Sequence, residues 1–243
     1  MKKFLTLAAF GLLLAMNVGA TPVLYNLGDL IDGDGEITVD DKIFYDFGFI
    51  RTCQPSDDYC SPFSADGIAV QGLSIDATHQ GLRFSSGFIV NGPNSFGNFL
   101  VSYKVRVAEW SDMLIKDMSL NLGGVSTEGC ELADICTIGI GESIDTLGGA
   151  SLADLSVSIN NKDDQADFTP VVAISVLKDI KIRINTNLGE FRGSPNDFVS
   201  FSVVDQIVSQ MDGSGDEEVP EPGTYALMGA GLLSLALYRR RRA

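Results

Sequence analysis

Histidine and tryptophan are almost absent from this sequence, which has one of each among its 243 residues. Because His79 is the only histidine, any Ser/His/Asp triad would have to include it. Its surroundings, residues 76–81, contain the Asp, Thr and Gly residues typical of a turn between strands. We therefore interpret His79 as a surface residue, assign no catalytic residue and expect no enzyme activity.

A glycan hydrolase that uses two carboxylates is the catalytic alternative left open. The 32 acidic residues offer many pairs, and a sequence cannot give the distance between two carboxylates. Glu142 and Glu109 are the first candidates, although each also fits an ordinary loop or strand-end carboxylate. Trp110 follows Glu109 at the end of an alternating strand, where it lies in the core unless it is exposed to stack on a sugar ring.

Basic residues are scarce: 17 Lys and Arg face 32 Asp and Glu, a net charge of -15. Without the two lysines and four arginines of the terminal segments described below, 11 basic groups face 32 acidic ones, a net charge of -21. A field of this sign opposes nucleic acid and anionic membrane surfaces, which we exclude as partners. Cations fit better, but an acidic, solvated surface explains the composition equally well.

The N-terminus has the pattern of a signal peptide, which we assign to residues 1–20. Lys2 and Lys3 form the charged region, residues 4–16 the apolar region, and residues 18–20 a small-residue cleavage site. The thirteen apolar residues are too few for a comfortable transmembrane helix, and no stop-transfer pattern follows them. The sequence therefore predicts export.

The C-terminus combines three features in order: a Pro-Glu-Pro motif, a short apolar segment and a cluster of arginines. The motif is Val219, Pro220, Glu221 and Pro222, and the cluster is Arg239, Arg240, Arg241 and Arg242. As a helix, residues 223–238 would be about 24 Å long, against a hydrocarbon core of about 30 Å, so they only just span it. The arginines predict retention of that end on the cytoplasmic side.

This arrangement resembles the PEP-CTERM sorting signal, which a membrane-embedded exosortase recognises. The resemblance covers residues 219–242, and the sorting signal is assigned to residues 220–243. The resemblance implies cleavage at or near the motif, followed by transfer to the cell surface or extracellular matrix. A plain C-terminal membrane anchor is the alternative. Residues 212–219, polar and acidic, are predicted to be a flexible linker to the signal.

Between the two ends, apolar residues recur with a period of two. In residues 99–107 the odd positions are apolar, while Ser102, Lys104 and Arg106 stand between them. Similar segments occur at 43–50, 68–75, 82–90, 113–122, 155–159, 170–177, 180–184 and 199–203. Roughly ten short strands with Gly, Asn, Asp and Ser turns predict an all-β domain, an antiparallel β-sandwich or jelly roll over residues 21–211. Helix is expected in the two removable terminal segments.

The four cysteines form two close pairs in turn-rich sequence: Cys53 with Cys60, and Cys130 with Cys136. Outside the cytoplasm such pairs suggest disulfides, and local pairing is the simplest of three connectivities. The spacing is not typical of zinc ligands, and no histidine is nearby. We expect structural disulfides.

The domain is also similar to a group of PEP-CTERM proteins at residues 29–31, 36–44 and 81–84, which implies a β-rich surface protein without an assigned activity. Residues 30–41 partly fit a calcium loop, with Asp32, Asp34 and Glu36 as candidate ligands. Leu30 stands where the first ligand belongs, and strand replaces the expected flanking helix. We interpret this segment as a turn, with a weak calcium site as the alternative and no other cofactor expected.

Together these features predict an exported, exosortase-processed protein with a structural or binding role in the bacterial envelope or biofilm matrix. A carbohydrate-binding module is the first alternative, and a secreted glycan hydrolase is the second. The expected partners are the exosortase and extracellular polysaccharide. Membrane contact is expected only transiently, through the C-terminal segment in the inner membrane.

Overall fold

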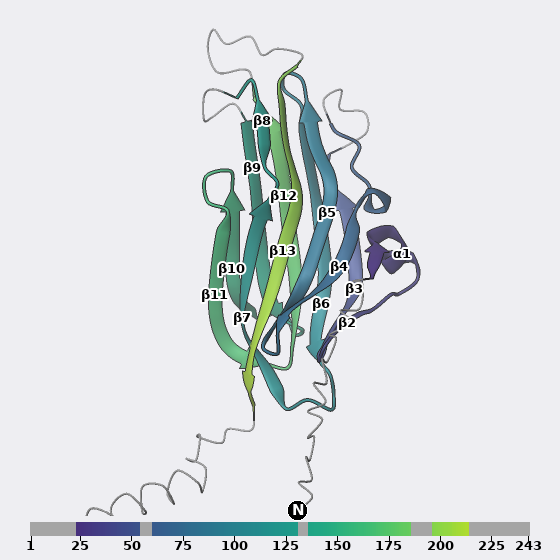
Figure 1. Cartoon of the computed structure of the whole chain (residues 1–243), viewed down its shortest axis with the longest axis vertical. Coiled ribbons are helices and arrows are strands. Elements are labelled where there is room, and N and C mark those ends of the chain that lie inside the picture. Colours follow the sequence, from purple (N-terminus) through teal and green to yellow (C-terminus); the bar gives the residue numbers. More distant parts are fainter. Residues whose placement is uncertain (1–22, 54–59, 131–135, 186–195, 214–243) are drawn as a thin grey trace, which may run out of the picture.

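The computed structural model describes residues 23–53, 60–130, 136–185 and 196–213. These residues form an all-β sandwich of two antiparallel sheets packed face to face (Figure 1). The predicted fold class is therefore confirmed. The predicted signal peptide, most of the predicted linker and the sorting signal, including Val219 and the four arginines, lie outside the described residues.

The first sheet has the strand order β1-β4-β5-β13-β7-β11, and β8 also pairs with β13. Its strands are β1 (Leu24–Asn26), β4 (Ala69–Asp76), β5 (His79–Asn91), β7 (Met113–Gly123), β8 (Ser126–Glu128), β11 (Asp163–Val171) and β13 (Phe198–Asp212). The second sheet has the order β10-β9-β12-β6-β3-β2. Its strands are β2 (Ile37–Val39), β3 (Lys42–Arg51), β6 (Phe96–Val107), β9 (Cys136–Thr146), β10 (Ser151–Ser158) and β12 (Ala173–Ile184).

Two short helices accompany the sheets in the described residues: α1 (Leu27–Asp32) and the 3-10 helix η1 (Ala65–Gly67). Asn26 caps α1 because its side-chain Oδ1 accepts a hydrogen bond of 2.8 Å from the backbone N–H of Gly28. Leu27 and Leu30 of α1 are buried against the sandwich. No helix within the described ranges has the length and apolar character needed to cross a membrane.

The core lies between the sheets and is built from the alternating residues of the strands. On β6, Phe99, Val101, Tyr103 and Val105 are all buried, as their spacing predicts. The ring centroid of Phe88 on β5 lies 4.4 Å from that of Phe201 on the neighbouring strand β13 and 5.6 Å from that of Phe99 on β6 in the opposite sheet. Burial of each such side chain stabilises the fold by roughly 1.5–3 kcal/mol.

The strand predictions need three corrections. β9 was missed, because glycines, which are rare in strands, occupy its outward positions 139 and 141, and Glu142 takes an inward position among apolar residues. The predicted strands 170–177 and 180–184 are largely one strand, β12, because Lys178 occupies an inward position that the pattern marks as a break. Residues 37–44 form a hairpin of β2 and β3, since the chain turns at Asp40, whose φ is 52°.

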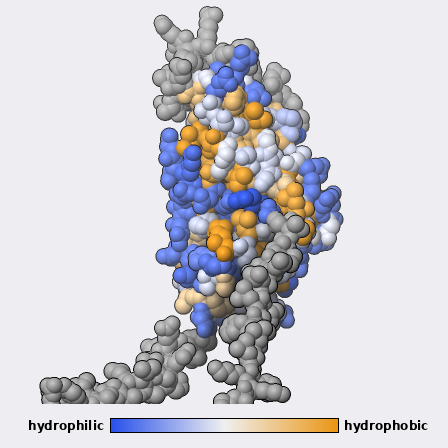
Figure 2. All heavy atoms as spheres, in the orientation of Figure 1, coloured by the Kyte–Doolittle hydropathy of each residue, from blue (hydrophilic) through white to orange (hydrophobic). Residues whose placement is uncertain are grey.

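The outer face of the first sheet mixes apolar and polar side chains. Figure 2 shows a broken band of hydrophobic side chains along the middle of this face and hydrophilic side chains along the edge formed by β10 and β11. Acidic residues of β11 contribute to that edge, among them Asp163 and Asp167. The charge of the domain is therefore carried partly by an edge of the sandwich.

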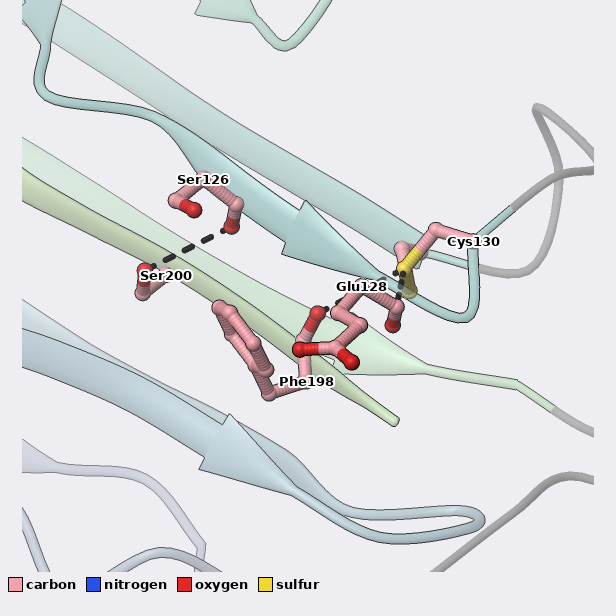
Figure 3. The surroundings of a disulfide bond; sticks show 6 residues. Ser126, Glu128, Cys130, Phe198 and Ser200 are labelled. Atoms are coloured by element: carbon pink, nitrogen blue, oxygen red, sulfur yellow. Dashed lines mark hydrogen bonds between the residues drawn. A yellow bond between two sulfur atoms is a disulfide. The ribbon is translucent and has the colours of Figure 1, made fainter. Parts of the chain in front are cut away.

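The cysteines pair locally, with Cα–Cα distances of 6.0 Å for Cys53 and Cys60 and 5.5 Å for Cys130 and Cys136. In Figure 3 the second pair lies beside β8, where the sulfur of Cys130 is 3.5 Å from the backbone oxygens of Glu128 and Phe198. Cys136 begins β9 in the opposite sheet, so this disulfide joins the two layers at one end of the sandwich.

Replacing both Cys130 and Cys136 by serine should lower the free energy of unfolding by about 2–3 kcal/mol, because the unfolded chain regains the entropy that the disulfide removes. The effect is modest because the closed loop is short. Urea unfolding of oxidised wild type and variant measures the difference. Reducing the wild type serves as the control for losing both disulfides. An unchanged unfolding midpoint in the double variant would contradict a structural role for this bond.

Candidate functional site

A cleft of about 730 Å³ lies at the end of the sandwich opposite the disulfides. Three connections meet there: the β2–β3 turn, the β4–β5 turn and the β6–β7 connection, together with the last part of β13. The lining residues are Asp40, Asp41, Ser74, Asp76, Ala77, Thr78, Trp110, Ser111, Met113 and Gln210. The cleft therefore draws side chains from both sheets.

Trp110 is the most exposed large apolar side chain of the described residues, with 75% of its surface accessible. It lies in the β6–β7 connection, where Ser111 N donates to Ala108 O at 3.0 Å and so tightens the turn. Placement of Trp110 in the core, as its position after an alternating strand indicates, is therefore wrong. Its other interpretation, an exposed aromatic ring, agrees with the structure.

Hydrogen bonds hold the turns of the cleft together. Ser111 Oγ donates to Asp41 Oδ2 at 2.6 Å and accepts a bond of 3.3 Å from Met113 N. Ser74 Oγ donates to Asp40 Oδ2 at 2.6 Å, which ties the β2–β3 turn to β4. The cleft wall beside Trp110 is thus fixed before any ligand arrives.

Beneath the cleft, the buried ammonium of Lys42 joins the two sheets. Its Nζ donates to Asp41 Oδ1 at 2.7 Å and to the side-chain oxygen of Gln210, whose Nε2 donates to Ala77 O at 2.9 Å. Burial alone would raise the pKa of Asp41, but the hydrogen bonds from Lys42 and Ser111 outweigh it, and the pKa is lowered. Burial lowers the pKa of Lys42.

At the β4–β5 turn, His79 is a surface residue, as its sequence context predicts, with 45% of its side chain accessible. Its Nδ1 lies 2.9 Å from Asp76 Oδ1, and Thr78 N donates to the same oxygen at 2.8 Å. The hydrogen bond from His79, aided by Thr78, lowers the pKa of Asp76 to about 2. Asp76 is therefore ionised at any pH above that value.

The two glutamates singled out in the sequence behave differently from one another. Glu142 lies in the middle of β9 and is buried, so its assignment to a loop or strand end is wrong. It pairs with Lys178 inside the core and does not reach the cleft. Glu109 is exposed next to Trp110 and is not among the residues that line the cleft. A general acid needs a raised pKa, whereas those of Asp41 and Asp76 are lowered.

The calcium candidates do not assemble into a site. Asp34 and Glu36 line a shallow hollow of about 280 Å³, but the Glu36 carboxylate lies 3.4 Å from Arg106 Nη2. Asp32 ends α1 and is not part of that hollow. Across the residues that the structure describes, no group of three His, Cys, Asp or Glu side chains is placed to hold a metal ion.

Comparison with known proteins identifies the C-terminus. Residues 218–242 match the family model "PEP-CTERM protein-sorting motif". The C-terminus of the chain therefore carries a PEP-CTERM sorting motif, as its residues predict. This motif indicates an exported protein that an exosortase sorts by way of the membrane. Comparison with curated protein sequences finds no match.

Solved structures with distant similarity come from several kinds of protein. A carbohydrate-binding module, TmCBM61 in complex with beta-1,4-galactotriose, has a TM-score of 0.27 and 9% identity, over 66% of this chain and 86% of that one. The arabinose-bound alpha-L-arabinofuranosidase MgGH51 has a TM-score of 0.21 and 15% identity, over 57% of this chain and 22% of that one. Tailspike protein 4 of bacteriophage CBA120 has a TM-score of 0.23 and 8% identity, over 71% of this chain and 20% of that one. Similarity at this level carries no argument about function.

The His79→Ala variant should raise the pKa of Asp76 from about 2 toward the ordinary value for aspartate, because the hydrogen bond from His79 is the largest cause of its lowering. Carboxyl ¹³C NMR titration of both proteins measures it. Thr78→Val should produce a smaller rise. A pKa that stays near 2 without His79 would show that the turn backbone alone sets it.

Proposed function

We propose that this protein is a glycan-binding component of the cell surface or extracellular matrix, delivered there by exosortase processing. The observation that carries the proposal is an exposed tryptophan at the edge of a preorganised cleft with carboxylate, hydroxyl and amide groups. The exported state follows from the sorting motif. The binding role and the final location are parts of the proposal.

The chemistry of the cleft suits a sugar ring. The apolar face of a pyranose packs on an indole ring, while its hydroxyl groups seek acceptors and donors around the rim. Asp40 and Asp76 supply acceptors, and Ser111 supplies a hydroxyl already held by Asp41. A ring stacked on Trp110 thus has polar partners nearby.

The charge of the cleft narrows the glycans that fit. Its lining includes Asp40, Asp41 and Asp76 and contains no Lys or Arg. Asp41 pairs with the buried Lys42, and Asp76 lies 2.9 Å from Nδ1 of His79. Uronic-acid polymers would meet like charge, as they would over the rest of the chain, whose net charge is -15 before processing. The proposed ligands are therefore neutral glycans and glycans that carry amino groups.

In this scheme, residues 1–20 and the sorting signal are removed, and residues 21–211 act as the binding domain. Gly213 N donates to Asp112 O at 2.9 Å, so the described chain ends on the same connection that carries Trp110. The cleft therefore lies at the end of the sandwich that leads to the sorting signal. Release from the membrane would free this end for ligand.

The Trp110→Ala variant should weaken binding to a neutral or amino-bearing polysaccharide by roughly tenfold or more, since loss of a central tryptophan commonly costs over 1 kcal/mol. Affinity electrophoresis in gels containing galactan, glucan, chitosan or polygalacturonate measures the retardation. The matched control is Ile50→Ala, which removes an exposed apolar side chain on β3 far from the cleft.

The expected result is retardation of wild type and Ile50→Ala by a neutral or amino glycan, none by polygalacturonate, and loss of retardation in Trp110→Ala. Equal retardation of all three proteins would place binding elsewhere. No retardation on any gel would refute the glycan-binding role and leave the sorting assignment intact.

Processing is tested separately in cells that contain the exosortase. The mature protein should lack Ala243 and have a C-terminus at or near Pro220, Glu221 and Pro222, as intact-mass measurement can establish. Glu221→Ala should leave the full C-terminus in place, whereas Glu217→Ala, just outside the matched residues, should be processed normally. A wild-type protein that retains its arginines would show the signal to be a permanent anchor.

A further inference from the structure

A second polar cluster lies wholly inside the core. Lys178 on β12 and Glu142 on β9 are register partners in the same sheet, and Gln206 reaches them from β13 in the opposite sheet. All three are buried at positions whose strand neighbours on the same face are apolar, such as Val176 and Ile180. A charged residue at such a position requires matched partners or a chemical role.

The contacts place an amine against a primary amide and a carboxyl group. Lys178 Nζ donates to Gln206 Oε1 and to Glu142 Oε2. Gln206 Nε2 donates to Ser119 O at 3.0 Å, and the Gln206 side chain also hydrogen-bonds the Glu142 carboxyl group. The lysine nitrogen therefore contacts the carbonyl side of the glutamine amide, and Glu142 lies beside both groups.

Two further observations describe the environment of this cluster. The ring of Tyr103 lies beside the amine, with Lys178 Nζ 5.8 Å from its centroid. Within the described residues, neither Glu142 Oε1 nor the Tyr103 hydroxyl has a hydrogen-bond partner. An unsolvated carboxylate with a free oxygen is costly, whereas a protonated carboxyl group in that place is far less so.

We propose that Lys178 and Gln206 form an intramolecular isopeptide bond, with Glu142 as the proton-transfer group. The lysine nitrogen attacks Cδ of Gln206 and forms a C–N bond. Glu142, in its protonated form, gives its proton to Nε2 and accepts the proton that the attacking nitrogen loses. The Cδ–Nε2 bond then breaks, ammonia leaves, and Glu142 ends in the state in which it began. No oxidant, reductant or further reactant is required.

The electrostatics of the cluster favour this chemistry. Burial lowers the pKa of Lys178 and raises that of Glu142, so the proton shifts from the ammonium toward the carboxyl group. The neutral amine is the nucleophilic form, and the protonated carboxyl group can protonate the leaving nitrogen. Exclusion of water protects the amide from hydrolysis during the reaction.

The Lys42 cluster provides an internal comparison, because Lys42 also contacts the amide of a β13 glutamine, Gln210. Its carboxylate, Asp41, accepts hydrogen bonds from Lys42 and Ser111, and its pKa is lowered. An ionised Asp41 can accept a proton but holds none to give to the leaving nitrogen. The bond is therefore assigned to Lys178 and not to Lys42.

Such a bond would join the two sheets covalently, from β12 to the last strand before the sorting signal. The Cys130–Cys136 disulfide joins the two layers at one end of the sandwich, and a reducing agent would open that bond but not the new link. For a protein held at a surface, this link lies on the path between the domain and its C-terminal attachment. It acts independently of the proposed glycan site.

Mass spectrometry of the folded, exported full chain tests the proposal directly. After reduction, the measured wild-type mass should be lower, by the mass of one ammonia, than the mass calculated from the sequence of the isolated chain. Digestion should yield one peptide pair that joins the segment containing Lys178 to the segment containing Gln206, with no trypsin cleavage at Lys178. Lys178→Arg should have the full sequence mass, and Lys181→Arg, an exposed neighbour on β12, should retain the ammonia loss.

Glu142→Gln should fold, as circular dichroism can verify, yet remain without the bond. A folded wild type at its full sequence mass would overturn the proposal even if every variant failed to fold. A cross-linked Glu142→Gln would overturn the role of Glu142. A bond found between Lys42 and Gln210 alone would overturn the assignment to Lys178.

Discussion

The structure depends on the packing of two sheets through strictly alternating inward residues. Each strand buries one of its faces in the core, so a polar residue on that face needs a hydrogen-bond partner inside the sandwich. Most inward positions are Ile, Val, Leu or Phe, and the rings of Phe88, Phe99 and Phe201 fill the centre. Two lysines are among the buried polar residues, Lys42 and Lys178, and each donates a hydrogen bond to a glutamine of β13 in the opposite sheet.

This constraint also explains the position of the cleft. β6 and β7 belong to different sheets, so the connection between them crosses from one layer to the other and carries Trp110 over the junction. The Lys42 cluster closes the core just below this junction, with Asp41 and Gln210 shared between core and cleft. A rigid buried network thus supports the proposed binding surface.

Much of the fold follows from alternation in the sequence, but the chemistry of its interior does not. Alternation predicts the strand of Phe99 and Val105 and the sandwich class, because one-face burial has a period of two. It misses β9, where glycines stand between apolar residues, and divides β12 at Lys178, since a lysine normally marks a solvated position. Lys178 and Gln206 meet only through the pairing of sheets, which local sequence does not encode. The exposure of Trp110 likewise depends on how the β6–β7 connection crosses between the layers.

Trp110 is the central contact of the proposed glycan site, and its fluorescence can report on binding directly. It is the only tryptophan in the chain, so any change in tryptophan fluorescence reports on the cleft. Titration of the purified domain with a neutral or amino-bearing oligosaccharide should shift the emission in a saturable way, with the same affinity as retardation in gels. Binding of the glycan without any change in tryptophan emission would contradict a glycan contact at Trp110.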